Sequence, residues 1–566
     1  MIILGLNYYF HDSTACIIKD GQLIAAIEEE RLNRDKHTQA FPELAIARCL
    51  KIAGLSYSDI DHIAVSIKPV TDWQRKSTYL LGHLGSFMPF FGHYVVNAYA
   101  KQRRFWLWYK LQFPSKQAGP KVHFIEHHHS HVAGSFFVSP YEEAALLGID
   151  GSGEWATTWL GHGKGNRVER FSQSYFPNSL GSFYEAVTEF CGFRPNYDEG
   201  KTMGLAPMGN PDTFIEETRK IVKVDKEGSI KIDLSYFNYQ NLVGRRCNDK
   251  FYKVFGKPRM HGEEFEQHHM DAAASFQRVL EERILEICDI LYAKTQAKHL
   301  VFSGGVSLNS VVNGRIVRES PFDDIYVMPA AGDNGTAIGA AYYLYNGMLQ
   351  NPRNYVHHDP YVGTSYTNEE IKKAIDGAKL KAEHVEDICE KVADLLAKGK
   401  IIGWFQGTME IGPRALGSRS ILANPAFPNM KDKINAEVKF REAYRPFAPS
   451  SIKEAYKEYF DLEVEAPFML KVCNVLEDKQ HLIPAITHVD GSARLQTVNK
   501  ETHPRYHELI RKLGEKTGIP VVLNTSFNIQ GEPVVESPVD ALRCFYSTGL
   551  DYLAIGNYLL TKETLK

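Results

Sequence analysis

Alternating apolar and polar runs divide the first third of the chain into two similar blocks. Residues 2–30 read as an apolar strand, a polar turn, a second strand, an Asp-Gly turn and a third strand, and residues 145–171 repeat that order. Each first strand carries Leu-Gly followed by Leu or Ile, and it ends on Asn7 in one block and on Asp150 in the other. The repetition predicts two α/β halves that face each other across a cleft.

Two further segments place glycine between a predicted strand and a predicted helix. Residues 299–316 and 323–345 both follow this order. Glycine at such a turn lets the backbone approach a sugar or phosphate and leaves helix N–H groups free to hold it. Together with the repeat, these turns predict the duplicated architecture of actin-like phosphotransferases, with a nucleotide-type ligand between the halves.

A Pro-rich, polar stretch at about residues 350–380 is typical of a linker. After it the pattern changes to a helix over 388–400, a strand over 401–407, an Arg-rich loop and a closing strand over 551–560. We therefore expect an α/β protein with two domains. The first, residues 1–355, is the duplicated actin-like domain, and the second, residues 356–566, is a further α/β domain.

Residues 79–100 lack a formal charge and approach the length of a membrane span. Polar and helix-breaking residues interrupt the stretch, so we expect a buried or pocket-lining pair of helices and no stable span. The basic and aromatic residues 101–110 leave peripheral membrane contact as a second interpretation. The N-terminus lacks the basic start of an export signal, which favours a cytoplasmic protein.

The composition indicates a globular protein and argues against some partners and metal sites. The chain has 566 residues, of which 44% are hydrophobic and 23% charged, which is typical of a globular protein with more than one domain. A net charge of −3 removes the electrostatic case for coating a polyanion, so we expect no nucleic-acid partner. Eight scattered cysteines form no C-x-x-C pair, which argues against a zinc ribbon or a disulfide scaffold.

The sequence EHHHSH, residues 126–131, concentrates four histidines. On a helix, His127 and His131 lie on one face, the geometry by which two histidines bind one metal. A helix-terminal pair bonded to backbone or water is the alternative. Asp150 and Asp333 fall in the same predicted cleft, and this favours a site with two imidazoles and two carboxylates. Such a set suits Fe(II), Mn(II) or Zn, with Fe(II) favoured.

Basic residues cluster in the second part of the chain beside glycine and proline. Surface charge is the ordinary interpretation of any single arginine. Five within 32 positions, among apolar and turn residues, instead predict a site for a substrate with several phosphates. They are Arg414, Arg419, Lys439, Arg441 and Arg445.

Motifs along nearly the whole chain resemble those of the NodU/CmcH family of O-carbamoyltransferases. In the first domain they are LGLNYYFHDSTACI, EEERLNRDKH, EHHHSH, GIDGSGEW, EGKTMGLAPMG, FSGGVSLN and GDNGTAIGAA. In the second they are GPRALGSRSILANP, KFREAYRPFAPS, RLQTV and NTSFNIQGEP. Residues 70–120 match no family motif.

The resemblance implies a relay between a TsaD-like domain and a YrdC-like domain. The YrdC-like domain would make carbamoyl-adenylate from the co-substrates ATP and carbamoyl phosphate. The TsaD-like domain would transfer the carbamoyl group to a hydroxyl of a small-molecule acceptor of natural-product or sugar-like type. Fe(II) would be the cofactor.

Site residues follow from the same resemblance. Fe(II) would be held by His127, His131, Asp150 and Asp333. The nucleotide part of carbamoyl-adenylate would contact Lys36, Asp150, Gly181 and Gly305. ATP and carbamoyl phosphate would be bound by Arg414, Lys439, Arg445, Arg494, Asn524, Ser526 and Asn528. His11, at the first turn of the cleft, is the candidate general base, and a turn histidine bonded to Asp12 is its alternative.

Other functions use the same domain types. Threonylcarbamoyl transfer to tRNA requires a basic surface that the composition does not favour. An actin-like ATPase or kinase, or a metal-binding scaffold, leaves the Arg-rich part unexplained.

The sequence does not identify the acceptor. Aromatic residues that stack on a ring or form plain core are Trp73, Phe87, Phe90, Phe91, Phe105, Trp106 and Trp108. A homodimer is the expectation from general frequency.

Overall fold

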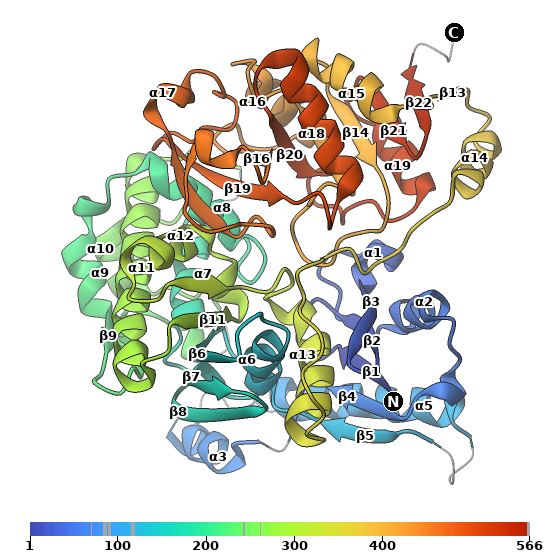
Figure 1. The fold of residues 1–566 in the computed structure, drawn as a ribbon. Coiled ribbons are helices and arrows are strands. Elements are labelled where there is room, and N and C mark those ends of the chain that lie inside the picture. Colours follow the sequence, from blue (N-terminus) through green and yellow to red (C-terminus); the bar gives the residue numbers. More distant parts are fainter. Residues whose placement is uncertain are drawn as a thin grey trace. The chain divides into compact units, whose positions relative to one another are not determined.

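A computed structural model describes residues 1–69, 71–82, 88, 92–114, 119–241, 244–260 and 262–562 (Figure 1). The chain forms two compact units. The first contains residues 1–26 and 37–357, and the second contains residues 27–36 and 358–566. The predicted division into 1–355 and 356–566 leaves the segment 27–36 in the first domain, whereas in the structure it belongs to the second unit.

The first unit contains two five-stranded sheets. One has the order β3-β2-β1-β4-β5, in which β1 is antiparallel to β2 and parallel to β4. Its strands are β1 (Ile2–Asn7), β2 (Thr14–Lys19), β3 (Gln22–Glu28), β4 (His62–Val65) and β5 (Lys121–Phe124). Apolar residues of β1 and β2 other than Ile2 are fully buried, as their sequences predict.

The second sheet repeats the topology of the first. Its order is β12-β11-β6-β7-β8, with β6 antiparallel to β7 and parallel to β11. The strands are β6 (Glu143–Ile149), β7 (Ala156–Lys164), β8 (Arg167–Tyr175), β11 (His299–Ser303) and β12 (Asp324–Tyr326). The duplicated α/β arrangement predicted from the sequence repeat is confirmed.

Equivalent helices follow the last strand of each sheet and lie side by side in Figure 1. They are α6 (His127–Phe137), after β5, and α13 (Thr336–Tyr342), after β12. The helices meet at two glycines, because a Cβ on Gly134 would lie 2.0 Å from Gly339 Cα. The glycines of the repeated Leu-Gly pair, Gly5 and Gly148, likewise let these helices pack closely on the sheets. A Cβ on Gly5 would lie 2.2 Å from Ala337 O of α13, and one on Gly148 would lie 2.6 Å from α6.

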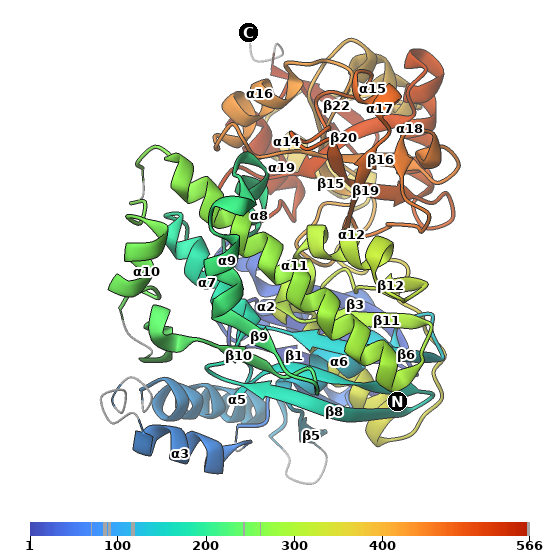
Figure 2. The ribbon, with the colours of Figure 1, turned by 90° about the vertical axis from the view of Figure 1, so that its left-hand side faces the viewer.

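Further helices surround these sheets, and Figure 2 shows the long α11 from the side. They include α2 (Glu43–Ala53), α7 (Leu180–Phe190), α8 (Glu199–Leu205), α9 (Ile215–Ile221), α10 (Asp249–Phe255), α11 (Gln267–Thr295) and α12 (Ser310–Glu319), with a hairpin of β9 (Val222–Val224) and β10 (Ile230–Ile232). Helix α11 packs on α7. Phe276 stacks on Phe183 with ring centres 4.5 Å apart, and the Tyr184 hydroxyl donates to Gln277 at 2.7 Å.

The segment without a family motif contributes α3 (Trp73–Gly82), a π-helix (Gly92–Asn97) and α5 (Ala98–Gln112). For residues 79–100 the sequence predicts a buried or pocket-lining helical pair. The buried form is wrong for the described residues Leu81, Met88 and Val96, which are 77%, 73% and 51% exposed, and the pocket-lining form stays a prediction. No helix among the described residues has both the length and the apolar character needed to cross a membrane.

Aromatic residues of this segment divide between core and surface. Phe105 and Trp108 are buried, so the plain-core interpretation holds for both. Trp73 and Trp106 are each 39% exposed. The remaining aromatic residues singled out from the sequence, Phe87, Phe90 and Phe91, lie outside the described residues.

The second unit is built on one ten-stranded sheet of order β13-β22-β21-β14-β15-β20-β16-β19-β18-β17. Its strands are β13 (Glu383–His384), β14 (Ile402–Phe405), β15 (Arg419–Ala423), β16 (Ala448–Ile452), β17 (Phe460–Asp461), β18 (Lys471–Val475), β19 (Ser492–Val498), β20 (Val521–Ser526), β21 (Tyr552–Ile555) and β22 (Tyr558–Thr561). Its helices are α1 (Glu29–Asn33), α14 (Asn368–Gly377), α15 (Ile388–Ala397), α16 (Met430–Ile434), α17 (Glu477–Gln480), α18 (Pro504–Thr517) and α19 (Pro538–Tyr546). Helices α15 and α18 share a core with Trp404 of β14, and the unit has the expected α/β class.

Candidate active site

Two histidines and two aspartates converge in the first unit. His127 and His131 lie one turn apart on α6, and their Nε2 atoms are 3.0 Å from each other. Asp150 follows β6 and Asp333 precedes α13. Asp150 Oδ2 lies 3.2 Å from His127 Nε2, and Asp333 Oδ1 lies 3.4 Å from both imidazole Nε2 atoms. One ligand atom from each residue lies within 4.8 Å of the other three.

The charges of these residues depend on one another. Burial alone would lower the pKa of His127, but the charge of Asp333 and a hydrogen bond to Asp150 raise it well above its usual value. Burial would raise the pKa of Asp150, whereas hydrogen bonds from His127 and His131 hold it well below its usual value. The carboxylates therefore favour protons on both imidazoles, although two protonated Nε2 atoms 3.0 Å apart repel. A divalent cation between the four atoms would replace both protons and remove this repulsion.

Glu154 fixes the start of α6, and sequence reasoning missed it. Its two carboxylate oxygens accept from the backbone N–H of His127 at 3.1 and 3.2 Å, and Oε1 also accepts from Lys68 N at 2.7 Å. The side chain is buried. It thereby ties the helix that carries both histidines to the end of β4. Its place in the GIDGSGEW motif was the signal available in the sequence.

His11 belongs to a chain of three hydrogen-bonded side chains. Its Nδ1 lies 2.9 Å from Asp12 Oδ2, and His37 Nδ1 lies 2.7 Å from Asp12 Oδ1. The other ring nitrogen of His11 lies 3.9 Å from Asp333. Burial lowers the pKa of His11, but Asp333 and Asp12 raise it to about 10. The bond to Asp12 leaves Nε2 on the side of the metal-ligand cluster, so the two interpretations of His11 are compatible. His37 was missed, although it follows Lys36 in a family motif.

Glycines at two turns allow backbone to approach Asp150. Gly305 N donates to Asp150 Oδ1 at 3.1 Å. A Cβ on Gly181 would lie 2.6 Å from Gly151 N, so only glycine fits where α7 begins. Asp150, Gly181 and Gly305 are thus close together, as predicted. Lys36, assigned to the same ligand from the sequence, belongs to the second unit.

Glu185 of α7 also reaches this turn and was not predicted. A Cβ on Gly151 would lie 2.8 Å from Glu185 Oε1. Arg246 pairs with the other carboxylate oxygen at 2.9 Å. Burial raises the pKa of Glu185 and Arg246 lowers it, with a net rise. The carboxylate is therefore held at the edge of the Asp150 turn by one fixed ion pair.

In the second unit, burial and the charges of neighbouring guanidinium groups lower the pKa of Arg414, Arg441 and Arg494. Burial, and then the charges of Arg414, Arg441 and Arg445, hold the pKa of Arg494 well below its usual value. Burial and Arg445 lower the pKa of Arg414 to about 10. Glu442 approaches Arg445 at 3.8 Å. Such a concentration of positive charge is unfavourable alone and favours a ligand with several anionic oxygens.

Lys439 joins two of the other predicted residues, Ser526 and Asn528. Its buried Nζ donates to Ser526 Oγ at 3.2 Å, to Asn528 O at 2.9 Å and to Asn528 Oδ1 at 2.8 Å. Burial, Arg441 and Arg445 hold its pKa well below the usual value. Asn524 donates to Ala415 O at 3.1 Å, beside Arg414. The structure therefore brings the predicted phosphate-site residues into one neighbourhood.

Arg419 does not share this role, and its inclusion in the phosphate site is wrong. Its guanidinium is fully buried and donates to the carbonyl oxygens of Gln406, Gly407, Ser418 and Thr364. It also lies over the ring of Phe405 at 3.7 Å. Because its guanidinium binds four carbonyl groups, Arg419 crosslinks loops to strand β14 and has a structural role.

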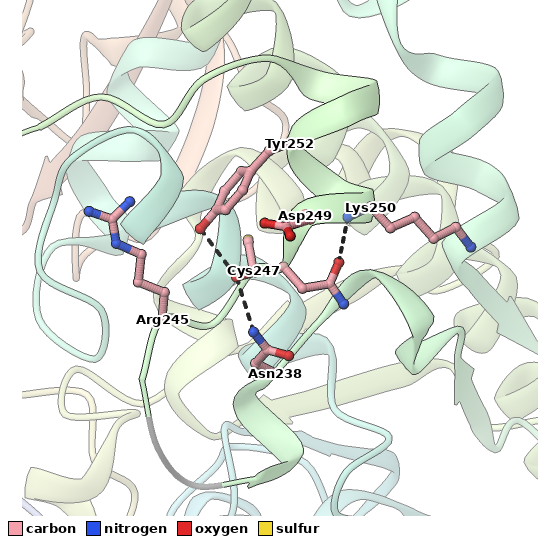
Figure 3. A pocket seen from close by; sticks show the side chains of 7 residues that line it. Asn238, Arg245, Cys247, Asp249, Lys250 and Tyr252 are labelled. Carbon is pink, nitrogen blue, oxygen red and sulfur yellow. Dashed lines mark hydrogen bonds between the residues drawn. The ribbon is translucent and has the colours of Figure 1, made fainter.

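An open pocket lies beside the start of α10 (Figure 3). In it, Tyr252 Oη and Asn238 Nδ2 both donate to Cys247 O, at 3.2 and 3.5 Å. Its lining residues are Asn238, Arg245, Cys247, Asn248, Asp249, Lys250 and Tyr252. None of the predicted site residues lines it.

Family models establish what kind of protein carries these sites. The model described as the carbamoyltransferase N-terminus matches residues 2–342, and the model of the carbamoyltransferase C-terminus matches residues 393–562. The chain belongs to the carbamoyltransferase family. It is therefore an enzyme, and the resemblance to the NodU/CmcH group is confirmed.

Relatives of this carbamoyltransferase match it along most of its length. It is 40% identical to the uncharacterized protein sll1178 of Synechocystis sp., over 99% of this chain and 96% of that one. It is 37% identical to the nodulation protein NolNO of Sinorhizobium fredii, over 99% of this chain and 80% of that one. The 3'-hydroxymethylcephem-O-carbamoyltransferase of Amycolatopsis lactamdurans is 29% identical over 64% of each chain.

Proposed function

We propose that this carbamoyltransferase makes carbamoyl-adenylate from carbamoyl phosphate and ATP in its second unit and transfers the carbamoyl group to an acceptor hydroxyl in its first. The proposal rests on the different charged groups that the two units contain. The second unit gathers Arg414, Arg441, Arg445 and Arg494, whereas the first gathers two imidazoles and two carboxylates. Guanidinium groups suit phosphates, and the mixed donor set suits a divalent metal.

Adenylate formation needs positive charge at fixed positions. Carbamoyl phosphate and one water give phosphate and carbamate. A carbamate oxygen then attacks the α-phosphorus of ATP, and pyrophosphate leaves. Both steps place negative charge on oxygens that leave, and the four guanidinium groups stabilise this charge without reorganising. Lys439 is held at the same site by the Ser526 and Asn528 oxygens, and a bound phosphate would favour its protonated form.

Transfer needs a base and an oriented acyl group. The acceptor oxygen attacks the carbamoyl carbon, the bond from that carbon to the phosphate oxygen breaks, and AMP leaves. His11 Nε2 takes the acceptor proton once the imidazole is neutral, which requires that a cation offset the Asp333 charge that raises its pKa; Asp12 accepts from Nδ1–H and thus fixes the tautomer. Gly181 and Gly305 let the adenylate approach Asp150.

Fe(II) suits His127, His131, Asp150 and Asp333, because one ligand atom from each lies within 4.8 Å of the rest. When bound there, it would supply a Lewis acid beside the carbamoyl group. His127 Nδ1 is buried and has no hydrogen-bond partner among the residues that the structure describes, so α6 rather than a second hydrogen bond orients this ring.

A small-molecule acceptor is favoured over tRNA. The net charge is −3, and the arginines that gather on the second unit are partly buried in a compact site rather than spread as a stripe. Two relatives also support this choice. One is named for nodulation and the other for a cephem substrate.

Product analysis tests the proposal. The full chain, loaded with Fe(II), is incubated with ATP, carbamoyl phosphate and a panel of sugars, oligosaccharides and hydroxymethyl cephems. Pyrophosphate and phosphate should form, and AMP should appear together with an acceptor whose mass has gained one carbamoyl group. ADP as the nucleotide product would instead indicate a kinase or ATPase.

A further inference from the structure

The segment 27–36 is separated in sequence from the rest of the second unit by more than three hundred residues, yet it is part of that unit. It contains the end of β3 and the short helix α1. Glu28, Glu30 and Arg31 are all buried there. Charged side chains are rarely buried unless they are paired and hydrogen-bonded, so their contacts indicate a specific role.

Glu28 and Arg31 hold Gly412 by both of its backbone polar groups. Gly412 N donates to Glu28 Oε1 at 2.9 Å, and Arg31 donates to Gly412 O at 2.9 Å. Arg31 is also 3.4 Å from Glu28 and 3.0 Å from Glu30. Gly412 has a φ of +104°, a conformation that favours glycine. The two side chains and the glycine therefore form a closed ring of charge-assisted hydrogen bonds.

The loop that Gly412 begins carries Arg414, two residues further on. Its other end is fastened by Glu410, whose Oε1 accepts from the N–H of Leu416 at 2.6 Å and of Ser418 at 3.2 Å. Arg414 therefore lies between two fixed points, one supplied by α1 and one by the loop itself. Burial alone would lower the pKa of Arg31, but Glu28 and Glu30 raise it, with Glu410 contributing as well.

The rest of the segment contacts the other side of the same neighbourhood. Arg34 donates to Val534 O at 2.6 Å and to Pro533 O at 2.8 Å. The charge of Lys36 contributes to the low pKa of Lys439. The segment thus reaches both loops that carry the phosphate-site residues.

We infer that the segment 27–36 is a positioning element of the adenylate-forming site, in which Glu28 at the end of β3 and Arg31 of α1 set the place of the Arg414 guanidinium through Gly412. The inference rests on the proposed function of the second unit. It also means that residues 356–566 lack part of their own site. Loss of the two bonds to Gly412 should displace the Arg414 guanidinium and leave the other residues of the site in place.

A double-mutant cycle in the full chain tests the inference. Arg31→Lys keeps the buried positive charge but loses the fork that reaches both Gly412 O and Glu30. Glu28→Gln keeps the shape but weakens the bond to Gly412 N. Each change is measured alone and combined with Arg414→Ala, and Arg511→Lys, at a partly exposed side chain of α18, is the control arginine. Pyrophosphate release is followed in single turnovers, together with the KM for carbamoyl phosphate and ATP.

Either single change should lower pyrophosphate release about 10- to 100-fold, because small displacements of a catalytic group cost this much. In the Arg414→Ala background the same change should cost less than about twofold, since the group it positions is gone. Thermal unfolding should separate positioning from loss of fold. Equal costs with and without Arg414, or normal rates in both single variants, would overturn the inference. If the wild-type chain releases no pyrophosphate, the proposed function fails instead.

Discussion

His127 Nε2 and His131 Nε2 lie 3.0 Å apart on one face of α6, and both face the carboxylates of Asp150 and Asp333. The carboxylates favour a proton on each imidazole, although two protonated rings repel each other. One divalent cation bound by the four residues would replace both protons and remove this repulsion. The metal content of the protein is therefore the direct readout of this relationship.

Removing both imidazoles should abolish metal binding. In His127→Ala/His131→Ala, bound iron measured by elemental analysis should fall to near zero, and acceptor carbamoylation should be lost with it. Pyrophosphate release should persist, because the arginines belong to the other unit. Retention of stoichiometric iron by this folded variant would contradict the ligand assignment.

Glu154 should matter for the metal although it is not a ligand. Glu154→Gln weakens the two bonds to His127 N and so loosens the start of α6. Changes to groups that orient metal ligands typically cost about 10- to 100-fold in metal affinity. Competition with a chelator measures this, and Glu169→Gln on exposed β8 is the matched control. Equal affinities in the two variants would show that Glu154 does not orient the site.

The close contact between α6 and α13 predicts a stability effect. A Cβ on Gly339 would lie 1.8 Å from Ser130 O, so Gly339→Ala should destabilise the first unit by about 1–3 kcal/mol. Gly377, at the end of α14, has nothing within 4 Å of an added Cβ. Gly377→Ala should be neutral or slightly stabilising. Thermal unfolding of the two variants under one set of conditions checks the difference in sign.

Replacing two arginines of the second unit should have different effects, one on activity and one on stability. Arg445→Ala removes charge from the phosphate site, so pyrophosphate release should fall about 100-fold while the thermal transition stays near that of the wild type. Arg419→Ala leaves four carbonyl groups without their buried donor, so the protein should instead unfold at lower temperature or fail to accumulate. Normal pyrophosphate release by Arg445→Ala would place this residue outside the site.

Local patterns in the sequence predicted much of the first unit. The repeated Leu-Gly pair has a clear physical cause, since Gly5 and Gly148 admit the two equivalent helices. The spacing of His127 and His131 likewise determines their common face once the helix forms. Periodicity and turn chemistry act over a few residues, so features that depend on them can be derived from one sequence.

Contacts between distant segments could not be derived in this way. Nothing local distinguishes Arg419, which binds four carbonyl groups, from Arg445, which approaches Glu442. From the sequence, Glu28 and Arg31 are typical of charged surface residues. Only the structure shows that both bind the backbone of Gly412, which is far away in the sequence. Leu81 is apolar and yet 77% exposed, so hydrophobicity alone misplaced its segment.

The shared intermediate is the centre of the proposed relay, and a double-label experiment tests it most directly. The wild-type chain is mixed with carbamoyl phosphate radiolabelled in its carbonyl carbon and ATP radiolabelled in its α-phosphate, without acceptor, and quenched over time. One species should carry both labels, and adding the acceptor found in the panel should move the carbon label to the acceptor and the phosphorus label to AMP. Carbon label that reaches the acceptor while no doubly labelled species forms, or phosphorus label that appears in ADP, would contradict the relay.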